Sequence, residues 1–208
     1  MSVEIKKIKG DWQEIVDDCR LTVGLDSLGH DPTQEFKVGM MIAEHSPIRD
    51  ISVKFEDKMP YWVAMHFKTH IWESRSVTQR NDRQKNYDRN EAPQGAPVVL
   101  SGDCNLQHLI DTSRKRLCYC ASPETRAVWL NLREEIKKVM PEVAFAMVPN
   151  CVYRCGCPEP RMCKEMFFPK FLKEFDAEEP SHSICSIKSR YKVYDRLLDG
   201  QKEENAAD

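Results

Sequence analysis

Two periodicities in the apolar residues divide the chain into strands and helices. Residues 48–55 alternate apolar side chains (Ile51, Val53, Phe55) with polar ones, which predicts a strand with one buried face. Val3–Ile8 reads as a shorter strand. Residues 84–104 contain Pro or Gly at four positions, so we expect an irregular connection there.

Apolar residues at helical spacing predict several helices. One of them has a clear start, because Ser122 suits the N-cap, Pro123 the first helical position and Glu124 the first turn, where it meets the helix dipole favourably. Pro60 similarly fits the first turn of the helix after the central strand. The predicted helices are Trp12–Cys19, Gln34–Ala43, Tyr61–Ile71, Leu106–Leu117 and Pro123–Val139. This mixture of elements indicates an α/β (α+β) protein.

The composition is that of one ordinary domain, or of one domain with an appendage. Of the 208 residues, 41% are apolar and 31% are charged, and the net charge is −2. Such a charge does not fit a general binder of duplex nucleic acid, because those domains are strongly basic. No apolar run approaches the ~20 residues of a membrane-spanning helix, and residues 1–12 lack the apolar core of a signal peptide. We therefore expect a cytoplasmic protein that binds neither membrane nor duplex nucleic acid.

Cysteines are unusually frequent in the second half of the chain. There are nine, an odd number, which fits a reducing compartment. A loop rich in Pro and Gly gathers four of them in the pattern C-x3-C-x-C-x5-C, as Cys151, Cys155, Cys157 and Cys163. Four thiolates would suit a tetrahedral structural zinc ion, with Cys118 or Cys120 able to replace Cys155. Reduced cysteines without metal are the main alternative. An iron–sulfur cluster is a further one, although the spacing matches no common run of iron–sulfur ligands.

A third feature combines two histidines with a basic loop. His66 and His70 stand four residues apart on one predicted helix and so share a face. The loop after them alternates Arg and Lys with Ser, Thr, Gln and Asn, which contact phosphate and heteroatom-rich rings. Helix histidines and basic loops are also common as plain solvated surface. Together, however, they favour an anionic heterocycle as the ligand.

The order of these residues resembles the flavin-dependent thymidylate synthases. That family has Glu-His, a strand exit Phe-x-x-Lys-x-Pro, a helix that ends in Arg-His-Arg, and a polar loop that closes on Ser-x-Arg. The counterparts here are Glu44-His45, Phe55 to Pro60, Thr69-His70-Ile71 and residues 76–83, which end in Asn81-Asp82-Arg83. A second block follows in the family's order, with Asn105-Leu106-Gln107, Arg116, and Ala121 to Arg126.

Several positions depart from the family pattern. Thr69 and Ile71 replace both arginines of Arg-His-Arg, and Asn81 replaces the serine of Ser-x-Arg. The segment between the loop and Asn105 is also shorter, so helices that carry one of the family's substrate arginines are expected to be absent. The resemblance covers roughly residues 40–145.

The resemblance implies an antiparallel sheet with packed helices and a defined chemistry. In this family methylene-tetrahydrofolate supplies the carbon, and FAD reduced by NADPH supplies the hydride, that convert dUMP into dTMP. The cofactors carry the hard chemistry, so no protein side chain, cysteine included, is singled out as catalytic. By position, the flavin contacts would be His45, His70, Asn105 and Asp111. The substrate contacts would be His66, Gln79, Asn81, Arg83 and Arg116.

The family is a homotetramer with FAD between subunits, which implies shared sites here. We expect a thymidylate synthase-like domain in residues 1–148, a Cys-rich C-terminal extension in residues 149–200 and a disordered tail in residues 201–208. Two other functions fit the departures from the motif. The same flavin and folate chemistry could add another one-carbon group, such as hydroxymethyl, to a pyrimidine nucleotide, or the chain could be a non-catalytic nucleotide-binding homologue.

Overall fold

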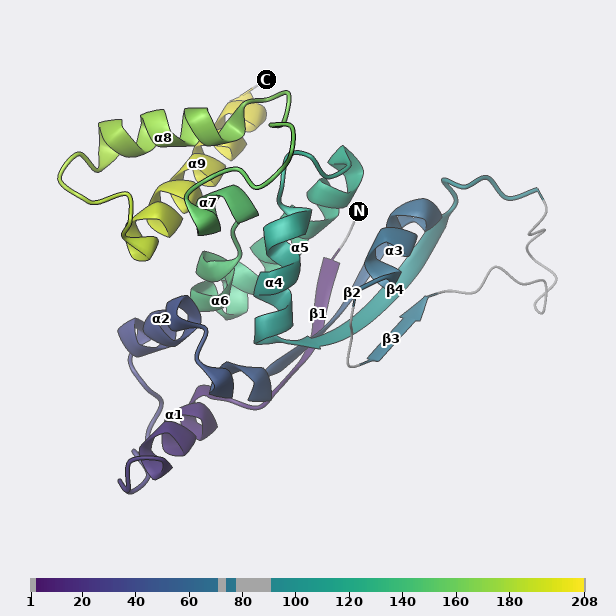
Figure 1. Cartoon of the computed structure of the whole chain (residues 1–208). Coiled ribbons are helices and arrows are strands. Elements are labelled where there is room, and N and C mark those ends of the chain that lie inside the picture. Colours follow the sequence, from purple (N-terminus) through teal and green to yellow (C-terminus); the bar gives the residue numbers. More distant parts are fainter. Residues whose placement is uncertain (1–2, 71–73, 78–90, 208) are drawn as a thin grey trace.

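The computed structural model is built on a four-stranded antiparallel sheet with the strand order β1-β2-β4-β3 (Figure 1). It describes residues 3–70, 74–77 and 91–207. The strands are β1 (Val3–Lys9), β2 (Ser52–Pro60), β3 (Ser74–Val77) and β4 (Pro97–Asn105). The central pair stays in register from Ser52 opposite Asn105 to Pro60 opposite Pro97. The helices that follow β2 and β4 therefore begin at opposite ends of this ladder.

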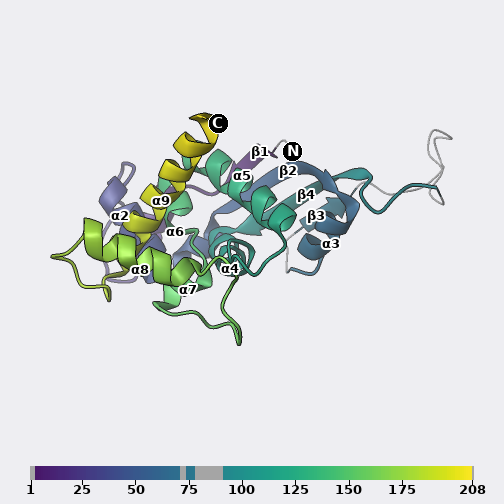
Figure 2. The same cartoon turned by 90° about the horizontal axis from the view of Figure 1, so that it is seen from above.

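The helices are distributed unevenly over the molecule. In both views the C-terminal helices α7 to α9 gather at the end away from β3 (Figures 1 and 2). A 3-10 helix, η1 (Ser46–Asp50), precedes β2. The α-helices are α1 (Trp12–Leu21), α2 (Gln34–Ala43), α3 (Tyr61–Lys68), α4 (Leu106–Arg116), α5 (Pro123–Val139), α6 (Pro141–Ala146), α7 (Asn150–Arg154), α8 (Phe167–Glu178) and α9 (Ile187–Ala207).

One continuous core joins the sheet to the helices. Phe55 of β2 and Phe67 of α3 both contact Trp129 of α5, with ring centroids 6.5 and 5.4 Å away. The same cluster of buried side chains continues into the C-terminal helices through residues such as Phe171 and Tyr194. The segment after residue 148 therefore shares its apolar core with the sheet domain.

Buried polar contacts tie the last helix to the same core. Arg133 of α5 has no exposed side-chain surface, and it donates to the carboxylate of Asp195 on α9 and to the carbonyl of Met147. Lys137, one turn further along α5, pairs with Asp195 and Asp199. The α5–α9 packing is thus fixed by charge pairing as well as by apolar contact.

The predicted α+β class and antiparallel sheet are confirmed, and several elements lie where the pattern placed them. Gln34–Ala43 and Pro123–Val139 have the predicted bounds, and Ser122 caps the second by accepting from the N–H of Thr125. Helix α3 ends at Lys68 rather than Ile71. Helix α9 continues to Ala207, where the sequence predicts a disordered tail.

Two local predictions are wrong for identifiable reasons. Residues 97–105 form β4 instead of an irregular connection, because Pro97 stands at the strand's first position and Gly102 pairs opposite Phe55 within the ladder. Ile48 lies in η1 rather than in a strand, because Pro47 favours the first turn of a helix. Strand β2 instead runs on to Pro60, which precedes α3 as its N-cap residue.

Candidate functional site

The C-terminal ends of α3 and α4 meet at a cluster of histidine and arginine side chains. Arg116, the last residue of α4, donates from Nε to Nε2 of His70 at 2.7 Å. It also donates from Nη2 to the backbone carbonyl of His66 at 3.1 Å. Arg116 therefore binds the final turn of α3, where unpaired carbonyls favour a cation. We call Arg116, His70, His66 and His108 the His–Arg cluster.

His70 is neutral in this arrangement. Because Arg116 donates to Nε2, that nitrogen must accept and cannot carry a proton. Burial first, and then the nearby Arg116, His108 and Lys115 in that order, together lower the pKa of His70 to about 4. The ring of His108 lies edge-on at 6.3 Å, and burial also lowers its pKa. At neutral pH His70 is therefore uncharged beside the cation Arg116, and the donors of the cluster suit an anion.

His66 connects the cluster to the start of α5. Its Nδ1 lies 2.9 Å from the hydroxyl of Thr125, a buried residue in the first turn of α5. Thr125 accepts from the hydroxyl of Ser122 at 2.7 Å, so its own hydrogen is available to His66. The ring of Trp62 packs edge-on against His66 at 5.8 Å. His66 is thus oriented from two sides, as a ligand-binding imidazole requires.

The other predicted flavin residues lie on neighbouring parts of α4 and α2. Asp111 accepts from Arg114 at 2.8 Å, and Arg114 also pairs with Glu44. Glu44 caps α2 in a left-handed conformation, with φ of 51°, and places the exposed His45 next to it. Asn105 is the N-cap of α4, and its Oδ1 accepts from the N–H of His108 at 2.9 Å.

The structure thus gathers only part of the predicted set. His66, His70 and Arg116 come together, whereas Asp111 and His45 flank the Glu44–Arg114 pair. Gln79, Asn81 and Arg83 lie outside the described residues. Sequence reasoning missed His108 and Thr125. His108 carried a signal, because it stands eight residues before Arg116 and so shares a face of α4 with it.

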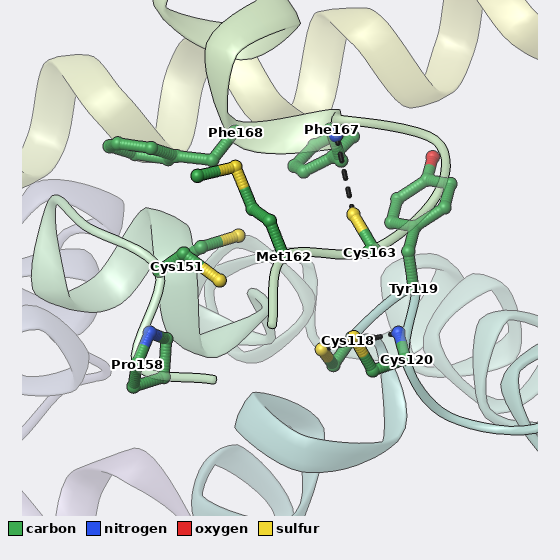
Figure 3. Close-up of a pocket in the computed structure, with 10 residues that line it drawn as sticks. Cys118, Tyr119, Cys120, Cys151, Pro158, Met162, Cys163, Phe167 and Phe168 are labelled. Carbon is green, nitrogen blue, oxygen red and sulfur yellow. Dashed lines mark hydrogen bonds between the residues drawn. The ribbon is translucent and has the colours of Figure 1, made fainter. Parts of the chain in front are cut away.

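Cysteines of the α4–α5 turn and of the chain in and after α7 gather at one place. Five of them line one small pocket of about 10 Å³ (Figure 3): Cys118, Cys120, Cys151, Cys157 and Cys163. Cys155, a member of the set predicted from the spacing, is not among the lining residues, because it forms the left-handed C-cap of α7. Within residues 3–70, 74–77 and 91–207, no group of three or more His, Cys, Asp or Glu side chains is already arranged to hold a metal ion.

As free thiols, Cys118, Cys120 and Cys151 are poor nucleophiles. Burial raises the pKa of Cys151 to about 12 and that of Cys120 to about 11. Burial also raises the pKa of Cys118. A thiol with such a pKa is protonated at neutral pH, and only the thiolate attacks. Cysteine chemistry is therefore not the activity that this geometry favours.

Comparisons with known proteins identify the fold. No family model and no curated protein matches the sequence. A solved structure of the UMP/dUMP methylase PolB from Streptomyces cacaoi, bound with 5-Br dUMP, matches with a TM-score of 0.56 and 15% identity, over 70% of this chain and 93% of that one. This chain has the fold of PolB. PolB bound with 5-Br UMP gives a TM-score of 0.53 and 14% identity, over 70% and 92% of the two chains.

The PolB-like fold thus accounts for most but not all of this chain. Nearly the whole of PolB is matched, whereas almost a third of this chain lies outside the match. In the part that the structure describes, none of the helices is long and apolar enough to cross a membrane.

Proposed function

We propose that this protein is a flavin-dependent pyrimidine nucleotide methylase that converts dUMP into dTMP in the cytoplasm. Methylene-tetrahydrofolate would supply the carbon, and FAD reduced by NADPH the hydride. The contact between Arg116 and His70 carries this proposal, because it joins residues from the two separate blocks of the thymidylate synthase-like motif, 46 positions apart. The likeness to PolB, a UMP/dUMP methylase, supports the same substrate class.

Arg116 is the residue that we assign to the nucleotide. Its guanidinium donates to a neutral imidazole and to a carbonyl, which are weaker acceptors than a phosphate. A nucleotide phosphate would form charge-assisted, bidentate contacts with the same planar group. His66, held by Thr125, would contact the substrate beside it. Gln79, Asn81 and Arg83 are proposed as further substrate contacts.

The donors of the cluster also suit an anionic cofactor. His70 and His108 are half-buried imidazoles beside the cations Arg116 and Lys115, and this set fits the phosphates and ring heteroatoms of FAD. We propose that His70, His45, Asn105 and Asp111 hold it. Bound FAD would supply the hydride, and the chain's own residues would orient it. Asp111 must then leave its pair with Arg114, or contact FAD through its second oxygen.

Shared sites are part of the proposal. The family to which the motif is similar places FAD between subunits of a homotetramer. Two of the residues proposed for FAD here, His70 and Asp111, lie at different faces of α4. His70 contacts the Arg116 face, and Asp111 contacts the Glu44 face. In a homo-oligomer, one FAD molecule would contact the first face of α4 in one subunit and the second face of α4 in another subunit.

A visible absorption spectrum of the purified protein with FAD, before and after dUMP, tests the proposal. We expect a protein-bound flavin spectrum that shifts on addition of dUMP. Arg116→Ala should abolish the shift, whereas Arg196→Ala, which removes a guanidinium paired with Glu178 and Glu179, should preserve it. No retained flavin, in wild-type protein, would instead favour a non-catalytic nucleotide-binding homologue.

Uridine monophosphate is a second candidate substrate. It is favoured by the PolB structure bound with 5-Br UMP, which shows that a protein of this fold accepts a ribonucleotide. The assay should therefore offer dUMP and UMP separately and identify the product by mass. A product heavier than the methylated nucleotide by one oxygen would indicate hydroxymethylation.

A further inference from the structure

Five thiols from two distant segments surround one small pocket. Cys118 and Cys120 lie in the turn between α4 and α5, and Cys151, Cys157 and Cys163 lie in and after α7 (Figure 3). The pocket volume of about 10 Å³ corresponds to one water-sized occupant. A water needs several polar partners, which a wall of sulfur, aromatic and aliphatic atoms does not offer. A single thiophilic ion fits this lining better.

Two of the sulfurs already accept hydrogen bonds from the backbone. The N–H of Cys120 points to Sγ of Cys118, and the N–H of Phe167 to Sγ of Cys163, each at 3.4 Å. Such outer contacts orient the ligands of metal sites. These bonds are a second observation, beside the residue types that line the pocket, and they point to the same kind of occupant.

The chain between α7 and α8 has little else to hold it. Residues 155–166 have no regular helix or strand, and most of them are exposed. Their described anchors are Cys163 and the aromatic wall, in which Tyr119 stacks on Phe167 with centroids 4.5 Å apart. A loop of this length usually needs a ligand or a cross-link to adopt one structure.

We propose that the pocket binds one Zn²⁺ ion through Cys118, Cys120, Cys163 and one of the neighbouring pair Cys151 and Cys157. Each thiol that binds releases its proton to solvent, and the ion becomes four-coordinate. Because the sulfurs are not yet arranged around a common point, binding requires their side chains to rotate inward. Cys155 takes no part.

Such a site would connect the C-terminal extension to the His–Arg cluster. Cys118 follows Arg116 by two residues, and Cys120 precedes the α5 cap residue Ser122 by two. The ion would therefore fix the turn whose ends carry Arg116 and the Ser122–Thr125 pair. The role of the ion would be structural, since four thiolates leave no open coordination position.

The first test is the metal content of protein purified with reductant and without chelator. We expect about one zinc per chain. Cys118→Ser and Cys163→Ser should each lose it, whereas Cys155→Ser and the remote Cys185→Ser should keep it. Loss in Cys155→Ser with retention in Cys118→Ser would replace this site by the one predicted from spacing alone. Zinc retained by all four variants would be an adventitious ion only, and absence from the wild type would overturn the proposal.

A second test uses only the wild-type chain, so it does not depend on the variants folding. Zinc-loaded protein is alkylated under native conditions, and the labelled peptides are mapped by mass spectrometry. Cys118, Cys120 and Cys163 should be protected, and Cys155 and Cys185 labelled. Chelator should make the protected cysteines reactive. Labelling unchanged by chelator, or protection through disulfides that reductant removes, would overturn the zinc site. Neither test involves flavin or nucleotide, so its failure is distinguishable from failure of the proposed activity.

Discussion

The guanidinium of Arg114 on α4 lies 3.6 Å from the centre of the Tyr153 ring on α7. The same guanidinium pairs with Glu44 at the end of α2 and with Asp111 on its own helix. Arg114 therefore joins three elements at one point, on the face of α4 next to that of Arg116. Stability of the C-terminal segment and placement of the candidate site are coupled through this contact.

Removing the Tyr153 ring should destabilise the protein. We expect Tyr153→Ala to lower the free energy of unfolding by about 1–3 kcal/mol, from the lost cation–π contact and the lost packing. Tyr153→Phe should cost much less, because it retains the ring. Urea denaturation of both variants measures this, and an equal loss in the two would show that the hydroxyl, rather than the ring, matters.

Removing the Arg116 guanidinium should weaken nucleotide binding. Charged hydrogen bonds contribute roughly 1.5–3 kcal/mol, so Arg116→Ala should raise the Kd for dUMP about 10- to 100-fold. Arg116→Lys should recover part of the affinity, since a lysine keeps the charge without the bidentate geometry. Calorimetric titration with dUMP supplies the values. Affinity unchanged in Arg116→Ala would remove this residue from the site.

The same substitution should change the titration of a neighbouring group. His70 has its pKa lowered to about 4 by burial first and by the charge of Arg116 second. In Arg116→Ala the pKa of His70 should therefore rise, but stay below its ordinary value of 6.5 because burial remains. NMR spectra of labelled histidines, recorded over a pH series, measure the pKa of His70 in both proteins. A pKa that falls or stays constant would contradict the contact.

Asp57 should give the protein a distinctive pH dependence. Its side chain is buried in β2, its carboxylate oxygens have no hydrogen-bond partner among the described residues, and burial raises its pKa from 3.8 to about 6. The folded state therefore holds this proton more tightly than the unfolded state, so stability falls as pH rises from about 4 to about 6.

Replacing the carboxyl group of Asp57 by an amide should remove this loss of stability at high pH. We expect Asp57→Asn to be more stable than wild type by about 3 kcal/mol at pH 7, and by far less at pH 4. The difference between the two proteins is the readout, because other carboxyl groups titrate equally in both. Urea titrations at pH 4 and pH 7 measure the difference in the free energy of unfolding between the two proteins. A difference that is the same at both pH values would show that ionisation of Asp57 is not its cause.

Local signals in the sequence determined the elements that were predicted well. Ser122, Pro123 and Glu124 specify the start of α5 by contacts within one turn, so no distant residue was needed. Strand β4 was missed because its stability comes from pairing with β2, about 45 residues earlier, which overrides the breaking tendency of Pro97 and Gly102.

The candidate site shows the same division between local and distant information. The resemblance to the family motif indicated Arg116 and His70 individually. It did not indicate their contact, which depends on the packing of α3 against α4. The spacing of the later cysteines suggested a cluster, yet Cys118 and Cys120 join the pocket only because the α4–α5 turn packs against the chain after α7. Spacing thus indicated Cys151, Cys157 and Cys163, with Cys118 or Cys120 as a replacement for Cys155, and tertiary packing brings these five thiols to one pocket.

The buried pairing of Arg133 with Asp195 has a consequence for how the chain folds during its synthesis. A buried cation without its partner is strongly destabilising, and Asp195 lies 62 residues after Arg133. While a ribosome is still making α9, the sheet and α5 can assemble only without the carboxylate of Asp195 beside that cation. We therefore expect the fully packed state to form only after Asp195 has emerged from the ribosomal exit tunnel.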